Sequence, residues 1–294
     1  MREQLDHFPS LERQIDSLRQ NGELFPEAER QEAWRPLPGV RMQDGTEALY
    51  DERVMNRITN ITAPCERVRE ALGRVRLNNT SSEADAFLDW YLQDPGLLVG
   101  FSGYGTAGYN YDAPADSIAA IFQTFRDQRL HIGGVTDGGT GYGVPGLSGA
   151  LAASFGHDPI GFAPLRSLRG AAPREDFVVV GEEFGDEAEA LGTMPDILFV
   201  YGGGKITRAE LGAALLAGST AVLLGKSESF GPDAPINQIE KDSRLTAARA
   251  NRKLLLCRNL AAIPGVVGQL EPDKLRHNRE QRRQHLTRLL KPTA

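Results

Sequence analysis

The sequence predicts an α/β protein built on a Rossmann-like, doubly wound and mainly parallel sheet, with a helical extension at its N-terminus. From residue 97 onward, short apolar runs bounded by glycine alternate with stretches of helical character. Such runs are typical of strands buried on both faces, and their alternation with helices is typical of a parallel sheet. Three of the runs also end in glycine-rich turns, which predicts several open strand-to-helix turns at one edge of the sheet.

Residues 1–95 differ in character, since they are rich in Arg, Glu and Gln. Apolar residues recur between positions 5 and 18 at intervals of three or four, which indicates a helix. A second helical pattern covers residues 65–75, and a third begins at 81 or 82 and ends at the Pro-Gly pair of 95–96. We expect this segment to pack on the main domain or to form a homo-oligomer contact.

Residues 96–262 are predicted to form the main domain. A helix is expected from Asp112, because Pro114 is tolerated in a first turn, and an Ala-rich helix is expected near 147–155. The strand candidates are 97–101, 130–135, 160–164, 177–180, 197–201 and 221–224. Residues 263–294 are predicted to be a basic tail, whose arginines and lysines lie on a solvated helix or a frayed terminus.

The glycine-rich turns follow the strand candidates that end at residues 101, 135 and 201. Because the carboxyl ends of parallel strands meet at one edge, we expect the three turns to line one site, where bare backbone N–H groups can reach a phosphate. The spacing in the central turn is not the G-x-G-x-x-G dinucleotide fingerprint. A long flexible surface loop is the alternative for that turn, although Tyr142 and the Val144-Pro145 pair are stiff residues among its glycines.

The third turn is the most specific, because Thr207 and Glu210 follow its three glycines. One interpretation is a capping box, in which Thr207 caps the helix and Glu210 bonds back to the cap. The other is that this pair lines the site, while the helix N-terminus holds an anion. The helix dipole is expected to keep Glu210 ionised. Lys205 either pairs with a phosphate or is simply solvated.

The candidate ligand-binding residues are those at the strand ends of this edge. Glu187, which follows the turn at 184–186, is either a second acidic group of the site or a helix cap. The candidate set is Ser102, Gly103, Gly134, Thr136, Gly143, Val144, Glu187, Gly202, Gly203, Gly204, Lys205 and Thr207.

The span of residues 97–231 resembles the SLOG superfamily of Rossmann-like nucleotide-ligand domains. It is most similar to the LSDAT branch, which is found alone in prokaryotes and at the N-terminus of TRPM channels. Residues 133–144 resemble the T-G-G-x-x-x-G-V turn of that branch, with extra residues inserted. Residues 177–180, followed by 184–187, resemble its F-x-L-V and W-G-D-E element, and residues 200–206 resemble its GGG strand end.

Two departures from these patterns leave the ligand and the chemistry open. Residues 225–232 replace the G-S-G-R-x-A-D segment that relatives usually carry. The cytokinin-activating LOG enzymes, more distant relatives, carry P-G-G-x-G-T-x-x-E. Thr207 and Glu210 keep the last part of that motif, but Gly202 stands in place of its proline and Ile206 in place of its third glycine.

The resemblance implies a sensor or binding protein for a nucleotide-derived ligand such as ADP-ribose or an NAD-like molecule. The alternative is a nucleotide N-glycosidase of the phosphoribohydrolase type. In that case Glu210 would assist departure of the base, and an arginine near Arg166 would hold the phosphate. A dehydrogenase is disfavoured, because the dinucleotide fingerprint and its ribose-binding acid are missing.

Composition and charge exclude several other classes. A net charge of −6 argues against a nucleic-acid partner. No apolar run is long enough to cross a membrane and no apolar signal region is present, so we expect a cytoplasmic protein without a membrane partner. The two cysteines lie far apart and the five histidines show no ligand spacing, so neither a metal site nor a bound cofactor is predicted.

Overall fold

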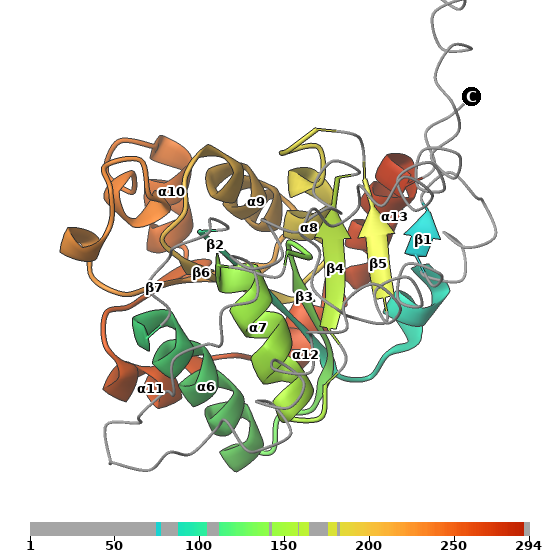
Figure 1. Ribbon diagram of the computed structural model, residues 1–294, viewed down its shortest axis with the longest axis horizontal. Coiled ribbons are helices and arrows are strands. Elements are labelled where there is room, and N and C mark those ends of the chain that lie inside the picture. The colour runs from blue at the N-terminus through green and yellow to red at the C-terminus, as the bar shows by residue number, and fades with distance from the viewer. Residues whose placement is uncertain are drawn as a thin grey trace, which may run out of the picture.

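The computed structural model describes residues 75–77, 88–104, 112–140, 143–157, 159–164, 176–180 and 183–290, and within them the chain forms an eight-stranded sheet. Its strand order is β1-β5-β4-β3-β2-β6-β7-β8, and every neighbouring pair is parallel (Figure 1). The strands are β1 (Val75–Leu77), β2 (Leu97–Gly103), β3 (Ile132–Asp137), β4 (Pro159–Ala163), β5 (Asp176–Val179), β6 (Ile197–Tyr201), β7 (Thr220–Leu224) and β8 (Leu254–Cys257). The sheet therefore has the parallel character that the sequence predicts.

Helices cover both faces of this sheet. They are α6 (Asp112–Asp127), α7 (Gly143–Ser154), α8 (Ala188–Thr193), α9 (Lys205–Leu216), α10 (Ser243–Ala250), α11 (Ile263–Val267), α12 (Pro272–His277) and α13 (Arg279–Leu290). The short 3-10 helices η4 (Ser227–Ser229), η5 (Pro235–Asn237) and η6 (Leu260–Ala262) lie in the connections. None of the helices in the described ranges is long and apolar enough to cross a membrane.

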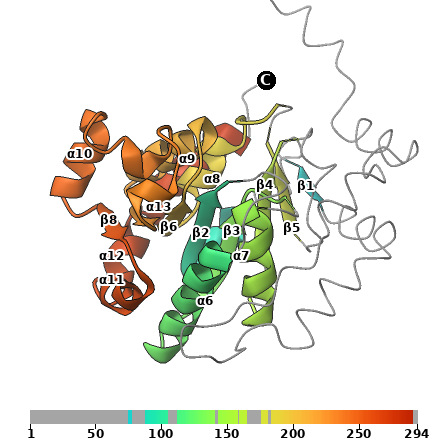
Figure 2. The ribbon, with the colours of Figure 1, turned by 60° about the vertical axis from the view of Figure 1, so that its left-hand side comes forward.

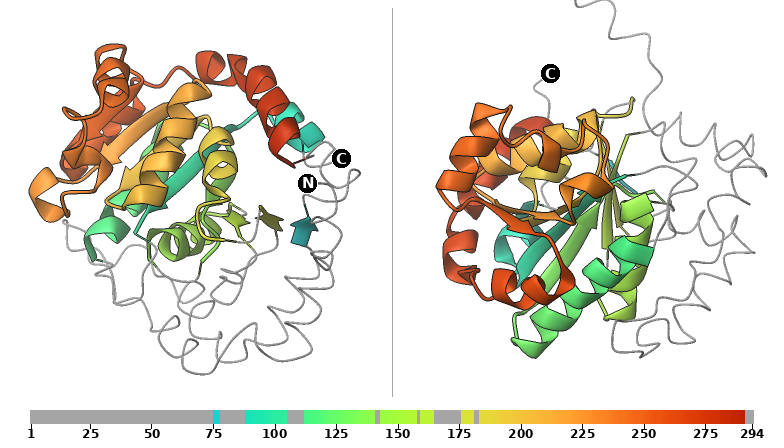
Figure 3. Two further views of the ribbon diagram at one scale, coloured as in Figure 1. Left: turned by 90° about the horizontal axis from the view of Figure 1, so that it is seen from above. Right: turned by 90° about the vertical axis from the view of Figure 1, so that its left-hand side faces the viewer.

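The central strands are buried on both faces. Along β2, Leu97, Val99 and Phe101 pack with α6, α7 and α11, while the intervening Leu98 packs with α8 and α13. On the same side as Leu98, Leu198 of β6 packs with α9 and α10. Figures 2 and 3 show the two helical layers on opposite sides of the sheet. This arrangement confirms the doubly wound α/β fold class.

The six strand candidates of the sequence are confirmed as β2 to β7, whereas β1 and β8 were not predicted. β8 is an apolar run flanked by Lys253 and Arg258 rather than by glycine, so it lacks the boundary signal of the others. β1 is only three residues long and pairs with β5, although it falls within the range assigned to the helical extension. A sheet boundary at residue 96 is therefore wrong. Residues 1–74, with the helical patterns predicted there, lie outside the described residues.

The C-terminal region is packed against the domain rather than solvated. Its helix α13 lies beside the helical residues 88–93 (Figure 3), and the Arg282 side chain of α13 is fully buried. Arg279 at the start of the same helix is 3% exposed. The prediction of a solvated basic tail is wrong for these two arginines, because they have a buried acidic partner elsewhere in the sequence.

That partner is Asp196, which lies immediately before β6 and is fully buried. Arg279 and Arg282 both form ion pairs with its carboxylate. The same carboxylate accepts a hydrogen bond of 2.9 Å from the N–H of Leu98 in β2, while the backbone carbonyl of Asp196 accepts one of 3.2 Å from the N–H of Thr220 in β7. Asp196 therefore joins the amino ends of three strands to α13.

We expect Asp196→Asn to destabilise the protein by about 3 to 5 kcal/mol, because it leaves two buried guanidinium groups without their countercharge. Chemical denaturation measures this free energy of unfolding. Asp273→Asn is the matched control, since Asp273 pairs with Arg276 but its side chain is 94% exposed, and its loss should cost about 1 kcal/mol or less. Equal effects of the two substitutions would contradict the structural role of Asp196.

Candidate functional site

The candidate site lies where the order of the strands reverses. From β2 the chain builds β3, β4 and β5 outward on one side, and then returns to place β6, β7 and β8 on the other side of β2. The reversal falls between β2 and β6, whose residues pair in parallel from Val99 with Ile197 to Gly103 with Tyr201. In open α/β sheets, ligands bind outside the carboxyl ends of the strands at such a switch point. The ends of β2 and β6 carry Ser102, Gly103 and the third glycine turn.

The turn between β6 and α9 presents backbone rather than side chains. Gly202 and Gly203 have φ values of +67° and +92°, in the left-handed region that favours glycine. Gly204 is the N-cap residue of α9, and the cap has no side-chain hydrogen bond. Lys205 is the first residue of the helix and is exposed. The first N–H groups of an uncapped helix have no partner within the helix, so this turn is chemically suited to an anion.

Thr207 and Glu210 do not form the predicted capping box. The helix α9 begins at Lys205, two residues before Thr207, so Thr207 lies inside it and Glu210 lies beyond the first turn. The Thr207 hydroxyl instead donates across to the carbonyl of Gly103 at 3.4 Å, and the Ser102 hydroxyl donates to the Glu210 carboxylate. These contacts connect α9 to the end of β2 and bring four of the candidate residues together.

Glu187 lies near this pair, at the N-cap position of α8. Its carboxylate does not cap α8 but accepts a hydrogen bond of 2.8 Å from the N–H of Gly185. Glu187 and Glu210 are each only 6% exposed. The negative charge of Glu187 contributes to a raised pKa of Glu210, so the site holds two coupled carboxyl groups.

Burial decides the protonation state of Glu210. Desolvation raises its pKa to about 7, the hydrogen bond from Ser102 opposes the rise, and the charge of Glu187 adds to it. Burial also raises the pKa of Glu187. The expectation that the helix dipole keeps Glu210 ionised is therefore wrong, because burial against β2 outweighs a dipole effect that falls off after the first turn. Near neutral pH, Glu210 can both donate and accept a proton.

Three of the predicted ligand-binding residues lie in the core or at the start of α7. Gly134 lies in the middle of β3, where a Cβ atom would come within 3.1 Å of Leu98 and 3.2 Å of Trp90, so it faces the core. Gly143 and Val144 begin α7, and the Val144 N–H donates a hydrogen bond of 2.7 Å to the carbonyl of Tyr104. The Val144 side chain packs on Gly103, so α7 supports the end of β2 rather than opening onto it.

Thr136 belongs to the same face of the sheet as the Ser102 side chain. It pairs directly with Gly100, two residues before Ser102, and residues alternate between faces along a strand. Thr136 is fully buried, and its hydroxyl has no hydrogen-bond partner among the described residues. Arg166, the predicted phosphate ligand, lies outside the described residues.

Sequence reasoning missed Asp137 and the aromatic cover of the turn. Asp137 ends β3, is fully buried, and accepts hydrogen bonds from the N–H of Gly139 at 2.8 Å and from Ser148 Oγ at 3.3 Å. A carboxylate at the end of a buried strand is the signal that could have identified it. Phe230 packs edge-on against Tyr201 with ring centroids 5.1 Å apart, and with Tyr104 it closes one side of the glycine turn. Within the described ranges, no group of three or more His, Cys, Asp or Glu side chains is placed to hold a metal ion.

Comparison with known proteins gives only distant similarities. No family model and no curated protein matches the chain. Among solved structures, it is similar to the molybdenum cofactor binding protein of Rippkaea orientalis, with 16% identity, a TM-score of 0.45, and coverage of 59% of this chain and 96% of that one. It is also similar to the Moco carrier protein of Chlamydomonas reinhardtii, with 21% identity, a TM-score of 0.43, and coverage of 59% and 96%. At these values the ligand has to be inferred from this chain's own residues.

Because burial raises the pKa of Glu210 from 4.5 to about 7, the folded protein keeps a proton that the unfolded chain releases between these pH values. Its stability relative to that of Glu210→Gln should therefore fall as the pH rises from about 4.5 to about 7, by about 3 kcal/mol in total. Urea unfolding at a series of pH values measures the difference. The exposed Glu240→Gln is the control and should follow the wild-type curve. Wild type and Glu210→Gln curves that run parallel would contradict the raised pKa.

Proposed function

We propose that this chain is a sensor or binding protein for a nucleotide-derived ligand, with ADP-ribose or an NAD-like dinucleotide as the first candidates. The observation that carries the proposal is the switch point between β2 and β6, where an uncapped helix N-terminus meets a buried carboxyl and hydroxyl pair. Nucleotides combine an anionic phosphate with ribose hydroxyls, which are the groups that these two features suit. The resemblance to SLOG domains, and to their LSDAT branch in particular, supports the same class of ligand.

In this proposal each part of the site has one task. The N–H groups at Gly204 and the start of α9 bind phosphate, and exposed Lys205 adds a positive charge beside it. Ser102 and Glu210 hydrogen-bond a ribose hydroxyl: Ser102 Oγ, which donates to Glu210, can still accept, and the other carboxyl oxygen of Glu210 can donate when it is protonated. Gly202 and Gly203 allow the left-handed backbone of the turn, in which a Cβ atom would collide with Tyr104 at Gly202 and with Thr207 at Gly203.

The second candidate function, a nucleotide N-glycosidase, is favoured by the environment of Glu210. A buried carboxyl with a pKa of about 7 is poised for general acid catalysis at neutral pH. As the bond between ribose and base breaks, protonated Glu210 would donate its proton to the leaving base. Water would add to the ribose carbon, and its surplus proton would return to the carboxylate. Arg166 would hold the phosphate in this mechanism.

Gly204→Val tests the phosphate position. A Cβ atom at Gly204 meets no atom within 4 Å and its φ is −136°, whereas one at Gly203 would collide with Thr207 at a φ of +92°. We expect Gly204→Val to lower affinity for ADP-ribose at least about 100-fold in calorimetry, since the side chain would occupy the place of a charge-assisted phosphate contact. Gly203→Val would damage the turn itself and is the less informative variant.

The control for this experiment is Gly265→Val in α11, where a Cβ atom also meets no atom within 4 Å. Melting temperatures verify that both variants are folded. Unchanged affinity of Gly204→Val would contradict the assigned phosphate position. Binding of the molybdenum cofactor, with none of ADP-ribose, NAD or AMP, would contradict the nucleotide proposal as a whole.

Glu210→Gln separates the sensor from the enzyme. For a sensor, the wild type releases no base from any bound nucleotide, and Glu210→Gln weakens binding about tenfold through the loss of one hydrogen bond to the carboxyl group. Chromatographic product analysis and calorimetry on the same samples measure both quantities. Release of nicotinamide or adenine by the wild type, lost about 100-fold or more in Glu210→Gln while binding persists, would replace the sensor with the N-glycosidase.

A further inference from the structure

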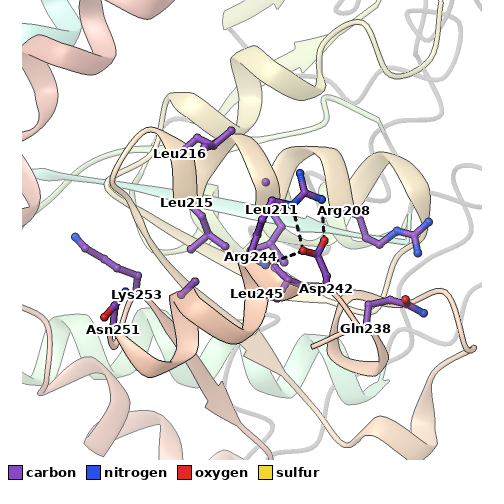
Figure 4. A pocket seen from close by; sticks show the side chains of 12 residues that line it. Arg208, Leu211, Leu215, Leu216, Gln238, Asp242, Arg244, Leu245, Asn251 and Lys253 are labelled. Carbon is purple, nitrogen blue, oxygen red and sulfur yellow. Dashed lines mark hydrogen bonds and ion pairs between the residues drawn. The ribbon is translucent and has the colours of Figure 1, made fainter. Parts of the chain in front are cut away.

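A cavity of about 480 Å³ lies on the side of α9 that faces away from β2, between α9 and α10 (Figure 4). Its floor is apolar and is formed by Leu211 and Leu215 of α9 together with Leu245 and Ala248 of α10. The size falls in the range of small-molecule sites, which are concave and mostly apolar with a few polar groups at defined places. We call this cavity the α9–α10 groove. None of the residues named above for the nucleotide site lines it.

The rim of the α9–α10 groove is cationic. Arg208, Arg244 and Lys253 line it together with a single carboxylate, that of Asp242. Arg244 already binds both oxygens of Asp242, at 3.1 and 2.7 Å, so this pair is internally neutralised. The charge of the groove is therefore set by Arg208 and Lys253, which Figure 4 shows at its opposite ends.

Neither of these end cations is strongly neutralised by the contacts that hold it. Lys253 Nζ donates to the carbonyl of Gly218 at 3.2 Å, and a carbonyl carries no full charge. Arg208 lies 3.6 Å from Asp233, whose side chain is 73% exposed and therefore screened by water. The groove thus presents positive charge beside an apolar floor, in a chain whose net charge is −6. An anion with an apolar body is complementary to both features.

Gly212 leaves the wall of the α9–α10 groove open. It lies within α9 on the wall of the groove, where a Cβ atom would meet no atom within 4 Å. Glycine inside a helix is destabilising relative to alanine, and the packing of the described residues does not require it here. A glycine does allow another molecule to approach the helix backbone closely. Leu216, at the end of the same wall, is 81% exposed and extends the apolar surface.

We propose that the α9–α10 groove binds an amphipathic carboxylate, with an alkyl chain along the leucine floor and its carboxylate at Lys253 or Arg208. Decanoate is the probe, and calorimetry at low salt is the measurement. Decanol, which has the same alkyl chain without a charge, measures the contribution of the chain. Decyltrimethylammonium, which carries a positive charge, tests the sign of the charge. We expect decanoate to bind at least tenfold more tightly than either compound, and its affinity to fall as salt is added.

Gly212→Leu should abolish decanoate binding, because the new side chain would fill the groove. Gly265→Leu in α11 is the matched control, since it places the same side chain at another helix glycine with open space around its Cβ position. The double variant Arg208→Gln, Lys253→Gln changes only rim residues and should lower affinity at least tenfold. Melting temperatures verify that each variant is folded.

Two results would overturn the proposal. One is binding of decanol as tight as that of decanoate, which would show that the cations do not select the ligand. The other is an affinity for decanoate that Gly212→Leu and the double variant both leave unchanged. Since the groove shares no residue with the Gly204 test, failure here does not bear on the nucleotide site.

Discussion

The fully buried carboxylate of Asp196 sets the position of the elements on which the rest of the structure depends. It forms ion pairs with Arg279 and Arg282, and it accepts a hydrogen bond from the backbone N–H of Leu98. Arg282 continues the network to the Tyr91 hydroxyl at 2.8 Å and to Ser219 Oγ at 3.1 Å. Because buried charges need hydrogen-bond partners, this network holds β2, β6, β7 and α13 together.

The amino ends of β2 and β6 are thereby fixed, and the candidate site lies at their opposite ends. There the structure departs from what stability alone would favour: Gly202 and Gly203 take left-handed backbone conformations, and Glu187 and Glu210 are carboxyl groups buried near each other. Perturbed carboxyl groups and unusual backbone conformations cluster at functional sites, where they trade stability for function.

The fold could be predicted from the sequence to the extent that local signals mark it. Glycine-bounded apolar runs identified β2 to β7, whereas β8 lacks that boundary. The burial of Arg282 could not be predicted, because its partner lies 86 residues away and a basic helix near the end of a chain resembles a solvated one. The protonation of Glu210 could not be predicted either, because it depends on the burial of Glu210 against β2, which is a tertiary contact. Gly134 is chemically like the glycines of the turns, and only the strand's length places it in the core.

The central claim is that the switch point between β2 and β6 is the ligand site. A crystal structure of the protein soaked with ADP-ribose tests it most directly. We expect phosphate density against the backbone N–H groups at Gly204 and Lys205, with a ribose beside the Ser102 and Glu210 pair. Density elsewhere, as in the α9–α10 groove, or an empty edge between β2 and β6 at saturating ligand would contradict it.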